Sequence, residues 1–362
     1  MARKPDGPLR RGWTTGACAT AATKAACTAL LEGEFPDPVS ILLPKGHEPS
    51  FALACQQLAS DFASASIVKD AGDDPDVTHL ALVTATLRRG AVGSGIVFRA
   101  GQGVGTVTLP GLPIAVGEPA INPVPRSLMS AVVEDIASQH SLSPDFVIEI
   151  GVADGEELAK QTWNPRLGIA GGLSILGTTG VVVPYSCSAW IQSIHSGIDV
   201  AVAGGVDHVA GCTGSISEAT VQRLHGLPDT AMLDMGDFVG GMLKYLRRHP
   251  VPRLTIGGGF GKLSKLAMGA MDLHSGRSQV DKQTLAEWLA DLGATAQLVD
   301  EARTANTANQ VLQLAMANDL PLADAVAQHA HLQALSMLDG DTQVQIIIVD
   351  RNGEPVGRAG EF

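Results

Sequence analysis

Gly-Ile-Ala-Gly-Gly-Leu-Ser-Ile-Leu-Gly-Thr-Thr-Gly-Val-Val-Val-Pro-Tyr-Ser, residues 168–186, carries the clearest turn signal of the chain. An apolar run, Leu173–Leu176, ends at Gly177-Thr178-Thr179-Gly180, a second apolar run follows, and a helical pattern begins near Ser186. A buried strand followed by a glycine-rich turn is typical of an α/β sheet that opens a crevice for a small ligand. A crossover turn in which the glycines only relieve steric strain explains the pattern equally well.

From about residue 160, strand-like and helical patterns alternate. Such alternation predicts a doubly wound parallel sheet, a Rossmann-like α/β domain whose ligand crevice lies at the carboxyl ends of the strands. The predicted strands are Leu173–Leu176, Val200–Ala203, Ala231–Met235, Arg253–Ile256 and Val344–Val349. The predicted helices fall near Ser188–His195, Ser215–Leu224, Asp237–Arg248, Lys262–Met271, Thr284–Leu292, Ala305–Ala317 and Leu322–Leu338.

The first part of the chain has a different rhythm. Alanine-rich residues 10–33 predict a helix that Thr14 or Thr15 caps and Gly33 ends. A second helix is predicted at Arg126–His140, and strands, mainly antiparallel, at Val39–Leu43, Phe51–Leu58, Leu80–Leu87, Gly95–Ala100, Gly103–Leu109 and Phe146–Val152. We therefore predict an α+β N-terminal domain with an antiparallel sheet at residues 1–160 and the Rossmann-like domain at residues 161–362.

Composition argues against several classes of protein. A net charge of −12 argues against general affinity for nucleic acid or an anionic membrane, and 4% aromatic residues are few for stacking bases. Five cysteines without a C-x-x-C pair fit neither a disulfide framework nor a zinc site. No signal-peptide pattern or membrane-spanning apolar run occurs. We predict a cytoplasmic protein with reduced thiols.

Two charged segments are candidate sites. Arg10 and Arg11 precede the first helix, whose N-terminus could bind an anion, although a capped helix with a solvated basic flank is the commoner explanation of such a pattern. Asp70, Asp73, Asp74, Asp76 and His79 surround a glycine-containing turn. Such a loop could bind a cation, supply an acid or base, or be a solvated turn, but its spacing misses that of a calcium loop.

Further glycine turns follow predicted strands. Gly257-Gly258-Gly259-Phe260-Gly261-Lys262 is not a P-loop, because Ile256 stands where its first glycine would be and Leu263 replaces the Ser/Thr. Cys212 in a Gly-Cys-Thr-Gly turn is more readily explained as a buried thiol than as a nucleophile. His274, like His79, is a candidate general base or a surface residue. The residues alone indicate an enzyme acting on a small ligand and name no reaction.

Together these stretches resemble one family, the CbiD family of cobalt-precorrin-5B C(1)-methyltransferases. The resemblance spans most of the chain in order. Its motifs are Leu9–Ala26, Lys69–His79, Gly103–Thr108, Val116–Arg126, Asn164–Ile169, Gly171–Pro184, Gly261–Gly269 and His274-Ser275. Two positions depart from the family pattern: Gly259 stands where histidine is common, and Asp237 where asparagine is common.

The resemblance implies S-adenosylmethionine-dependent methyl transfer to carbon 1 of cobalt-precorrin-5B, giving cobalt-precorrin-6A in cobalamin (vitamin B12) biosynthesis. S-adenosylmethionine is then a co-substrate, and no protein-bound metal is expected. The expected partner is the small tetrapyrrole substrate, with no nucleic acid or membrane, and a homo-oligomer is possible. A tetrapyrrole carrier or scaffold without turnover, or a nucleotide-dependent enzyme on a Rossmann-like sheet, are the alternatives.

Site roles follow as hypotheses from this resemblance. The methyl donor is assigned to two turns, Gly177-Thr178-Thr179-Gly180 and Gly257-Gly258-Gly259. A base would come from Asp70, Asp73, Asp74 or His79. The substrate carboxylates are assigned to the polar and basic residues Arg10, Arg11, Thr14, Thr15, Lys24, Arg126, Arg166, Lys262, Lys265 and His274.

Overall fold

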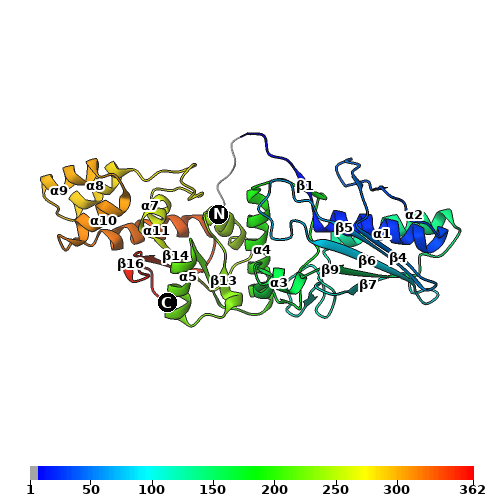
Figure 1. The fold of residues 1–362 in the computed structure, drawn as a ribbon. Coiled ribbons are helices and arrows are strands. Elements are labelled where there is room, and N and C mark those ends of the chain that lie inside the picture. The colour runs from blue at the N-terminus through cyan, green and yellow to red at the C-terminus, as the bar shows by residue number, and fades with distance from the viewer. Residues whose placement is uncertain (1–6) are drawn as a thin grey trace. The chain divides into compact units, whose positions relative to one another are not determined.

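The computed structural model describes residues 7–362 and contains two compact units, unit 1 ending at Cys187 and unit 2 beginning at Ser188 (Figure 1). This division falls later in the chain than the predicted boundary after residue 160. The cause is strand pairing: β10 (Ile169–Ala170) pairs with β8 (Thr106–Val107), and β11 (Val181–Val182) pairs with β1 (Gly12–Trp13). Residues 161–187 are thereby fastened to unit 1.

Unit 1 is organised around a five-stranded sheet with the order β4-β5-β6-β9-β7. Neighbouring strands are antiparallel except β7 and β9, which are parallel. The predicted antiparallel pairing of β7 is therefore wrong, because its connection to β9 passes through a helix, as parallel neighbours require. Its five strands are β4 (Cys55–Leu58), β5 (Phe62–Val68), β6 (Leu82–Arg89), β7 (Ile96–Ala100) and β9 (Phe146–Val152). Strands β2 (Val39–Ser40) and β3 (Ser50–Phe51) form a separate two-stranded sheet.

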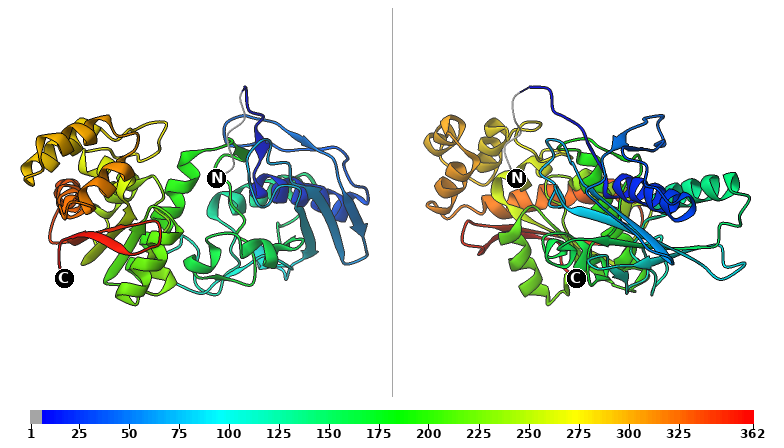
Figure 2. Two further views of the ribbon diagram at one scale, coloured as in Figure 1. Left: turned by 60° about the vertical axis from the view of Figure 1, so that its left-hand side comes forward. Right: turned by 45° about the vertical axis from the view of Figure 1, so that its right-hand side comes forward.

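Helix α1 (Thr15–Glu32) packs on β5 and β6 and against α2 (Pro123–Gln139), as the views in Figure 2 show. Its alanines are all buried, and their small side chains let the helix lie close to the sheet. Thr14 is the N-cap, its side chain accepting a hydrogen bond from the Ala17 amide, and Gly33 ends the helix in the left-handed conformation at φ 85°. Both predicted end signals are confirmed. Short helices α3 (Gly155–Ala159) and η1 (Asn164–Leu167) complete unit 1.

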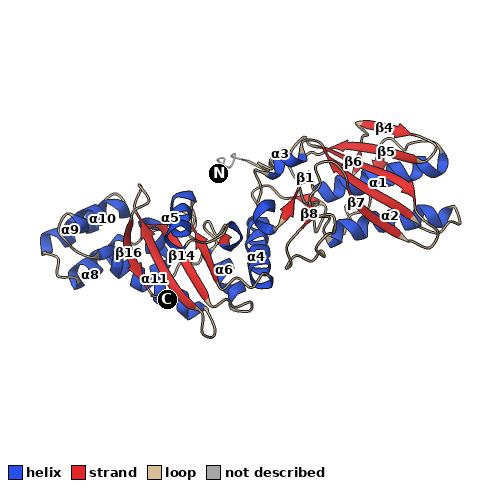
Figure 3. Cartoon of the chain, turned by 90° about the horizontal axis from the view of Figure 1, so that it is seen from below, coloured by secondary structure: helices blue, strands red, loops and turns tan. Residues whose placement is uncertain are grey.

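Unit 2 is organised around a second sheet, whose strands β14 and β16 are labelled in Figure 3. It has five strands in the order β13-β12-β14-β15-β16. The first four strands are parallel, and β16 returns antiparallel to β15. The strands are β12 (His208–Cys212), β13 (Met232–Leu233), β14 (Arg253–Gly259), β15 (Gln343–Val349) and β16 (Pro355–Ala359).

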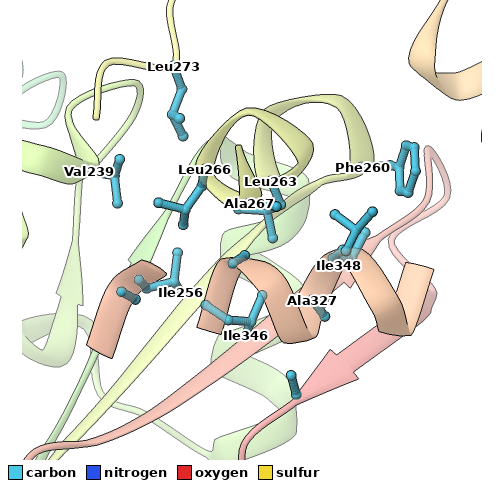
Figure 4. Close-up of a cluster of buried hydrophobic side chains, with 14 of the residues drawn as sticks. Val239, Ile256, Phe260, Leu263, Leu266, Ala267, Leu273, Ala327, Ile346 and Ile348 are labelled. Carbon is cyan, nitrogen blue, oxygen red and sulfur yellow. The ribbon is translucent and has the colours of Figure 1, made fainter. Parts of the chain in front are cut away.

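The two faces of this sheet pack against different helices. Ile256, Ile346 and Ile348 face the core formed with α7 and α11, where Leu263 and Leu266 lie (Figure 4). The alternate residues Ala210, Ile347 and Val349 pack with Val221 of α5 on the opposite face. The helices are α4 (Cys187–Ala203), α5 (Ser215–His225), η2 (Asp229–Ala231), α6 (Val239–Leu246), α7 (Phe260–Ala267), α8 (Lys282–Asp291), α9 (Ala296–Thr304), α10 (Ala308–Met316) and α11 (Leu322–Met337).

Two predicted strands of the parallel sheet are wrong. Val200–Ala203 forms the end of α4, whose buried Ile194, Ile198 and Ala201 follow helical spacing. Leu173–Leu176 is largely buried but makes only isolated bridges, Leu173 to Val104 and Ile175 to Ile121. The parallel sheet begins instead with β12, which the sequence analysis missed together with α9.

Candidate functional site

The carboxyl ends of β12 and β14 mark the point in unit 2 where the strand order changes direction. The chain leaves β12 for its neighbour β13 and then crosses to β14 on the other side of β12. Loops that leave two such strands diverge, and α/β sheets commonly bind ligands there. We call the residues Thr213, Gly214, Asp237, Gly257–Gly259 and Lys262 the switch point.

The glycines of the switch point have different surroundings. A Cβ added to Gly257 would lie 2.7 Å from Val221, and one added to Gly258 would lie 2.8 Å from Thr213 Oγ1. These two glycines are required by close packing of strand, loop and helix. A Cβ added to Gly259 or Gly214 would meet nothing within 4 Å. Of the predicted donor glycines in this turn, only Gly259 thus faces open space.

A charged pair lies beside this open space. Lys262 Nζ is 2.8 Å from Asp237 Oδ1 and donates a hydrogen bond of 3.1 Å to the Thr213 carbonyl. Lys262 keeps 39% of its side-chain surface exposed and Asp237 keeps 15%. The pair joins the ends of β12, β13 and β14, and the lysine can still reach solvent.

Lys265 and His274, the other predicted substrate-binding residues of unit 2, make hydrogen bonds elsewhere in the unit. Lys265 is buried and its Nζ donates a hydrogen bond of 2.9 Å to the Leu273 carbonyl. Burial lowers the pKa of its ammonium group. His274 is exposed, and its Nδ1 accepts a hydrogen bond of 3.1 Å from the Gly276 amide. The buried amine of Lys265 therefore supports the fold around Leu273.

In unit 1, residues 10–13 lie along the aspartate loop. The Trp13 amide donates a hydrogen bond of 2.7 Å to the Asp70 carbonyl, and the Asp73 amide donates one of 3.0 Å to the Arg10 carbonyl. The backbones approach so closely that a Cβ on Gly12 would lie 2.0 Å from the Ala71 carbonyl carbon. The predicted basic and acidic sites therefore lie together.

The aspartates of this loop are engaged in holding chain segments. The Arg10 guanidinium and the Gly72 amide bind the Asp70 carboxylate and lower its pKa to about 2. Asp73 accepts a hydrogen bond of 2.6 Å from the Arg10 amide, and Asp74 accepts one of 2.7 Å from the Tyr185 amide. A carboxylate with a pKa near 2 is a poor proton acceptor at neutral pH.

His79 remains the best placed of the predicted bases. Its Nδ1 accepts a hydrogen bond of 3.1 Å from the Ala71 amide, so in this geometry Nδ1 carries no proton. Within residues 7–362 no protein group is hydrogen-bonded to the other ring nitrogen, Nε2, and the side chain is exposed. Nε2 is thus the atom through which His79 could exchange a proton.

The Gly177–Gly180 turn packs against the start of α1. A Cβ on Gly177, at φ 137°, would lie 2.2 Å from Thr14 Oγ1, and one on Gly180 would lie 2.5 Å from Leu43. Thr179 Oγ1 bonds within the turn to Val181, whereas Thr178 is exposed. Close packing alone accounts for both glycines.

Backbone N–H groups at the N-terminus of α1 are already hydrogen-bonded to other groups of the protein. The Gly16 amide donates to the Leu176 carbonyl at 2.8 Å, and the Ala17 amide donates to Thr14 Oγ1 at 3.1 Å. Thr15 is buried. These two N–H groups are not free for the anion that the sequence analysis considered there.

The other basic candidates of unit 1 differ in their contacts. Lys24 Nζ donates to the Ser40 carbonyl at 2.9 Å. Arg126 donates to the Ile121 and Pro119 carbonyls and pairs with Glu118. The Arg166 guanidinium lies over the Trp163 ring, 4.6 Å from its centroid. Arg11 is exposed beside the aspartate loop.

The sequence analysis missed a cavity of about 410 Å³ in unit 1. Its walls come from the ends of β8, α3 and β10, and the glycines of residues 168–172 were the available signal. The lining residues are Thr108, Glu156, Ala159, Lys160, Pro165, Gly168, Ile169, Ala170, Gly171 and Gly172.

Cysteines and possible metal ligands are dispersed. All five cysteines are free thiols. Within residues 7–362, no three His, Cys, Asp or Glu side chains are grouped as metal ligands. No helix in that range is long and apolar enough to cross a bilayer.

Two family models match parts of this chain. The CbiD family model matches residues 2–184, and the model of the CbiD C-terminal domain matches residues 272–360. The chain belongs to the CbiD family. The CbiD match ends near the boundary between units 1 and 2.

Three relatives of this CbiD chain share the name cobalt-precorrin-5B C(1)-methyltransferase. The protein of Paramagnetospirillum magneticum is 61% identical over 97% of this chain and 98% of its own length. That of Rhodospirillum rubrum is 60% identical over 97% and 98%, and that of Brucella anthropi 60% over 97% and 95%. A crystal structure of the cobalamin biosynthesis protein CbiD from Archaeoglobus fulgidus is 29% identical, covers 75% of this chain and 84% of that one, and superposes with a TM-score of 0.41.

Proposed function

We propose that this CbiD chain transfers a methyl group from S-adenosylmethionine to carbon 1 of cobalt-precorrin-5B, forming cobalt-precorrin-6A in cobalamin biosynthesis. The observation that carries the proposal is the near full-length identity of about 60% to relatives named for this reaction. We place the reaction in the cytoplasm, where free thiols such as the five of this chain persist.

The donor site in this proposal is the switch point of unit 2. The order β13-β12-β14-β15, with helices on both faces, supports a doubly wound, Rossmann-like domain, and such domains bind ligands where the strand order reverses. Gly214 and Gly259 leave room for a ligand there. The Gly177–Gly180 turn is left out of the donor site, because close packing explains its glycines.

Little covalent chemistry is required of the protein. The methyl group of a sulfonium is already activated: its carbon–sulfur bond breaks as the new carbon–carbon bond forms, and S-adenosylhomocysteine leaves. The side chains then have to align donor and acceptor and exclude water. Cobalt enters with the substrate, so the reaction needs no further metal from the protein.

The substrate is a polyanion, and basic side chains would bind its carboxylates. In unit 1 we retain Arg11 and Lys24 for this role, arginine in bidentate fashion. Arg10 and Arg126 have their charges paired with Asp70 and Glu118 and are assigned to holding the loops. His79 is our candidate for the group that accepts a proton, through Nε2.

Two measurements test the proposal. Mass spectrometry of a reaction with cobalt-precorrin-5B and S-adenosylmethionine should show one added methyl group. A complex without turnover would instead identify a tetrapyrrole carrier or scaffold. Calorimetry should show binding of S-adenosylhomocysteine and not of NAD or ATP, and the reverse result would identify a nucleotide-dependent enzyme.

The role of His79 has its own test. His79→Gln should slow turnover about 10²-fold or more, the usual contribution of a general base. Binding of S-adenosylhomocysteine should not change. Asp73→Asn is the matched control, since Asp73 holds the Arg10 backbone and should affect stability more than turnover. Wild-type turnover by His79→Gln would remove His79 from the mechanism.

A further inference from the structure

Resting on the donor site proposed above, we propose that Lys262 and Asp237 bind the zwitterionic amino-acid end of the donor. Lys262 binds its carboxylate, and Asp237 binds its ammonium group. The ligand class of this subsite is therefore an α-amino acid head attached to an adenosine thioether or sulfonium.

The contacts of Lys262 leave it one donor for a ligand. A lysine ammonium has three N–H donors. One is donated to the Thr213 carbonyl at 3.1 Å, one is nearest Asp237 Oδ1 in an ion pair of 2.8 Å that lacks hydrogen-bond geometry, and the third meets no protein acceptor within residues 7–362. With 39% of the side chain exposed, that donor is accessible from the open side of the switch point.

The Asp237 carboxylate accepts fewer hydrogen bonds than a largely buried carboxylate usually does. Its Oδ1 is buried and accepts no hydrogen bond of good geometry, although Lys262 Nζ is near. Within the described part of the chain, that ammonium is the only polar group that pairs with the carboxylate. A carboxylate that is 85% covered ordinarily has several donors, so this one has capacity for a ligand cation.

A zwitterion suits this pair better than a simple ion does. An anion at Lys262 would be repelled by Asp237, and a cation at Asp237 would be repelled by Lys262. The amino-acid head of the donor carries both charges a few ångströms apart and can place each beside its opposite. The resulting arrangement alternates in sign and leaves neither side chain unpaired.

Another role for Asp237 has to be separated from this one. In doubly wound domains an acidic residue after the second strand often binds ribose hydroxyls. Asp237 follows β13, which is the second strand of this sheet in chain order. Ligands that keep the ribose but lose parts of the amino acid distinguish the two roles.

The experiment measures three ligands by calorimetry on the full chain. S-adenosylhomocysteine carries both head-group charges, 5′-S-(3-aminopropyl)-5′-thioadenosine carries only the ammonium, and 5′-methylthioadenosine carries neither. Lys262→Met keeps the aliphatic stem and removes the charge. Asp237→Asn keeps the shape, and Lys244→Met, at an exposed lysine of α6, is the matched control.

Lys262→Met should weaken S-adenosylhomocysteine about tenfold, the usual effect of one hydrogen bond to a charged group, and leave methylthioadenosine unchanged. The aminopropyl compound should bind at least as tightly as before, because its ammonium is no longer repelled by the lysine. Asp237→Asn should weaken S-adenosylhomocysteine and the aminopropyl compound but not methylthioadenosine. Retained methylthioadenosine binding also shows that each variant is folded. Lys244→Met should change nothing.

Three results would overturn the inference. Equal weakening of all three ligands by Lys262→Met would make the lysine structural, and loss of methylthioadenosine in Asp237→Asn would assign that carboxylate to the ribose. In either case the donor site itself survives. If the wild-type chain binds none of the three ligands, the donor site fails and the inference fails with it.

Discussion

Two glycine-rich turns, Gly177–Gly180 in unit 1 and Gly257–Gly259 in unit 2, look alike in sequence and differ in the structure. The first follows no regular strand and is filled from both sides by Thr14 and Leu43. The second ends β14 and has one glycine, Gly259, that faces open space at φ −72°. A glycine cluster therefore indicates close approach of backbone, and only its surroundings decide whether protein or ligand approaches.

The first and largest expected effect is on the stability of unit 1. Gly177→Ala places a Cβ 2.2 Å from Thr14 Oγ1 at φ 137°, so we expect the free energy of unfolding to fall by about 3 kcal/mol. Urea denaturation measures it. Gly171→Ala is the control, since Gly171 has φ 81° but nothing within 4 Å, and should cost about 1 kcal/mol. Equal losses in the two variants would mean that the contact with Thr14 is unimportant.

The second effect is on binding in unit 2. Gly259→Val fits the backbone and meets no protein atom within 4 Å of its Cβ, so stability should change by less than about 0.5 kcal/mol. Affinity for S-adenosylhomocysteine should nevertheless fall about tenfold or more, because the side chain occupies space assigned to the donor. Gly261→Ala, with an ordinary 3.8 Å contact to Ala308, should leave both quantities unchanged. Undiminished affinity in Gly259→Val would move the donor away from this turn.

Local signals in the sequence were sufficient for part of this architecture. The ends of α1 could be predicted because capping by Thr14 and a left-handed Gly33 depend on neighbouring residues alone. β12, His-Val-Ala-Gly-Cys, was missed because it has a single β-branched residue and two very small ones. Val200–Ala203 was mistaken for a strand because a short apolar run fits either structure.

The switch point depends on strand order, which no local pattern contains. Lys262 could be singled out for its charge near a glycine turn, but its partner Asp237 comes from a loop after another strand. The basic Arg10 and the acidic Asp70 were predicted as separate sites for the same reason. Their pairing follows from the close approach of Gly12 to Ala71, a tertiary contact.

The two units should also differ in their response to acid, with the larger effect in unit 2. Burial, together with His225 and Arg253, lowers the pKa of His208 to about 4, below its unfolded value of about 6.5. The unfolded chain therefore binds the proton more tightly, so this stabilisation is complete above pH 6.5 and is lost as pH falls toward 4. After allowance for solvent screening, we expect this loss to lower the free energy of unfolding by about 1 kcal/mol.

The comparison uses His208→Gln, which is neutral throughout that range. Urea denaturation of unit 2 should be less dependent on pH in this variant between pH 6.5 and 4 than in the wild-type chain. Replacing the exposed His274 with Gln is the control and should leave the slope as it was. An unchanged slope in His208→Gln would show that the ring is already accessible to protons in the folded state.

The smallest expected effect concerns Asp70. It tests whether the aspartate loop stabilises the fold or takes part in catalysis. Its folded pKa of about 2 lies below the unfolded 3.8, because the Arg10 guanidinium and the Gly72 amide bind the carboxylate. The stabilisation is therefore present above about pH 4 and disappears as pH falls toward 2. Both side chains are exposed, 59% for Arg10 and 41% for Asp70, so Asp70→Asn should lower the free energy of unfolding by only about 0.5 kcal/mol at pH 7.

Because a carboxylate already paired with arginine is a weak base, turnover of Asp70→Asn should stay within a few-fold of wild type. A loss of turnover far beyond the loss of stability would return Asp70 to the reaction and make the aspartate loop of unit 1, like the switch point of unit 2, a place where ligand and protein meet.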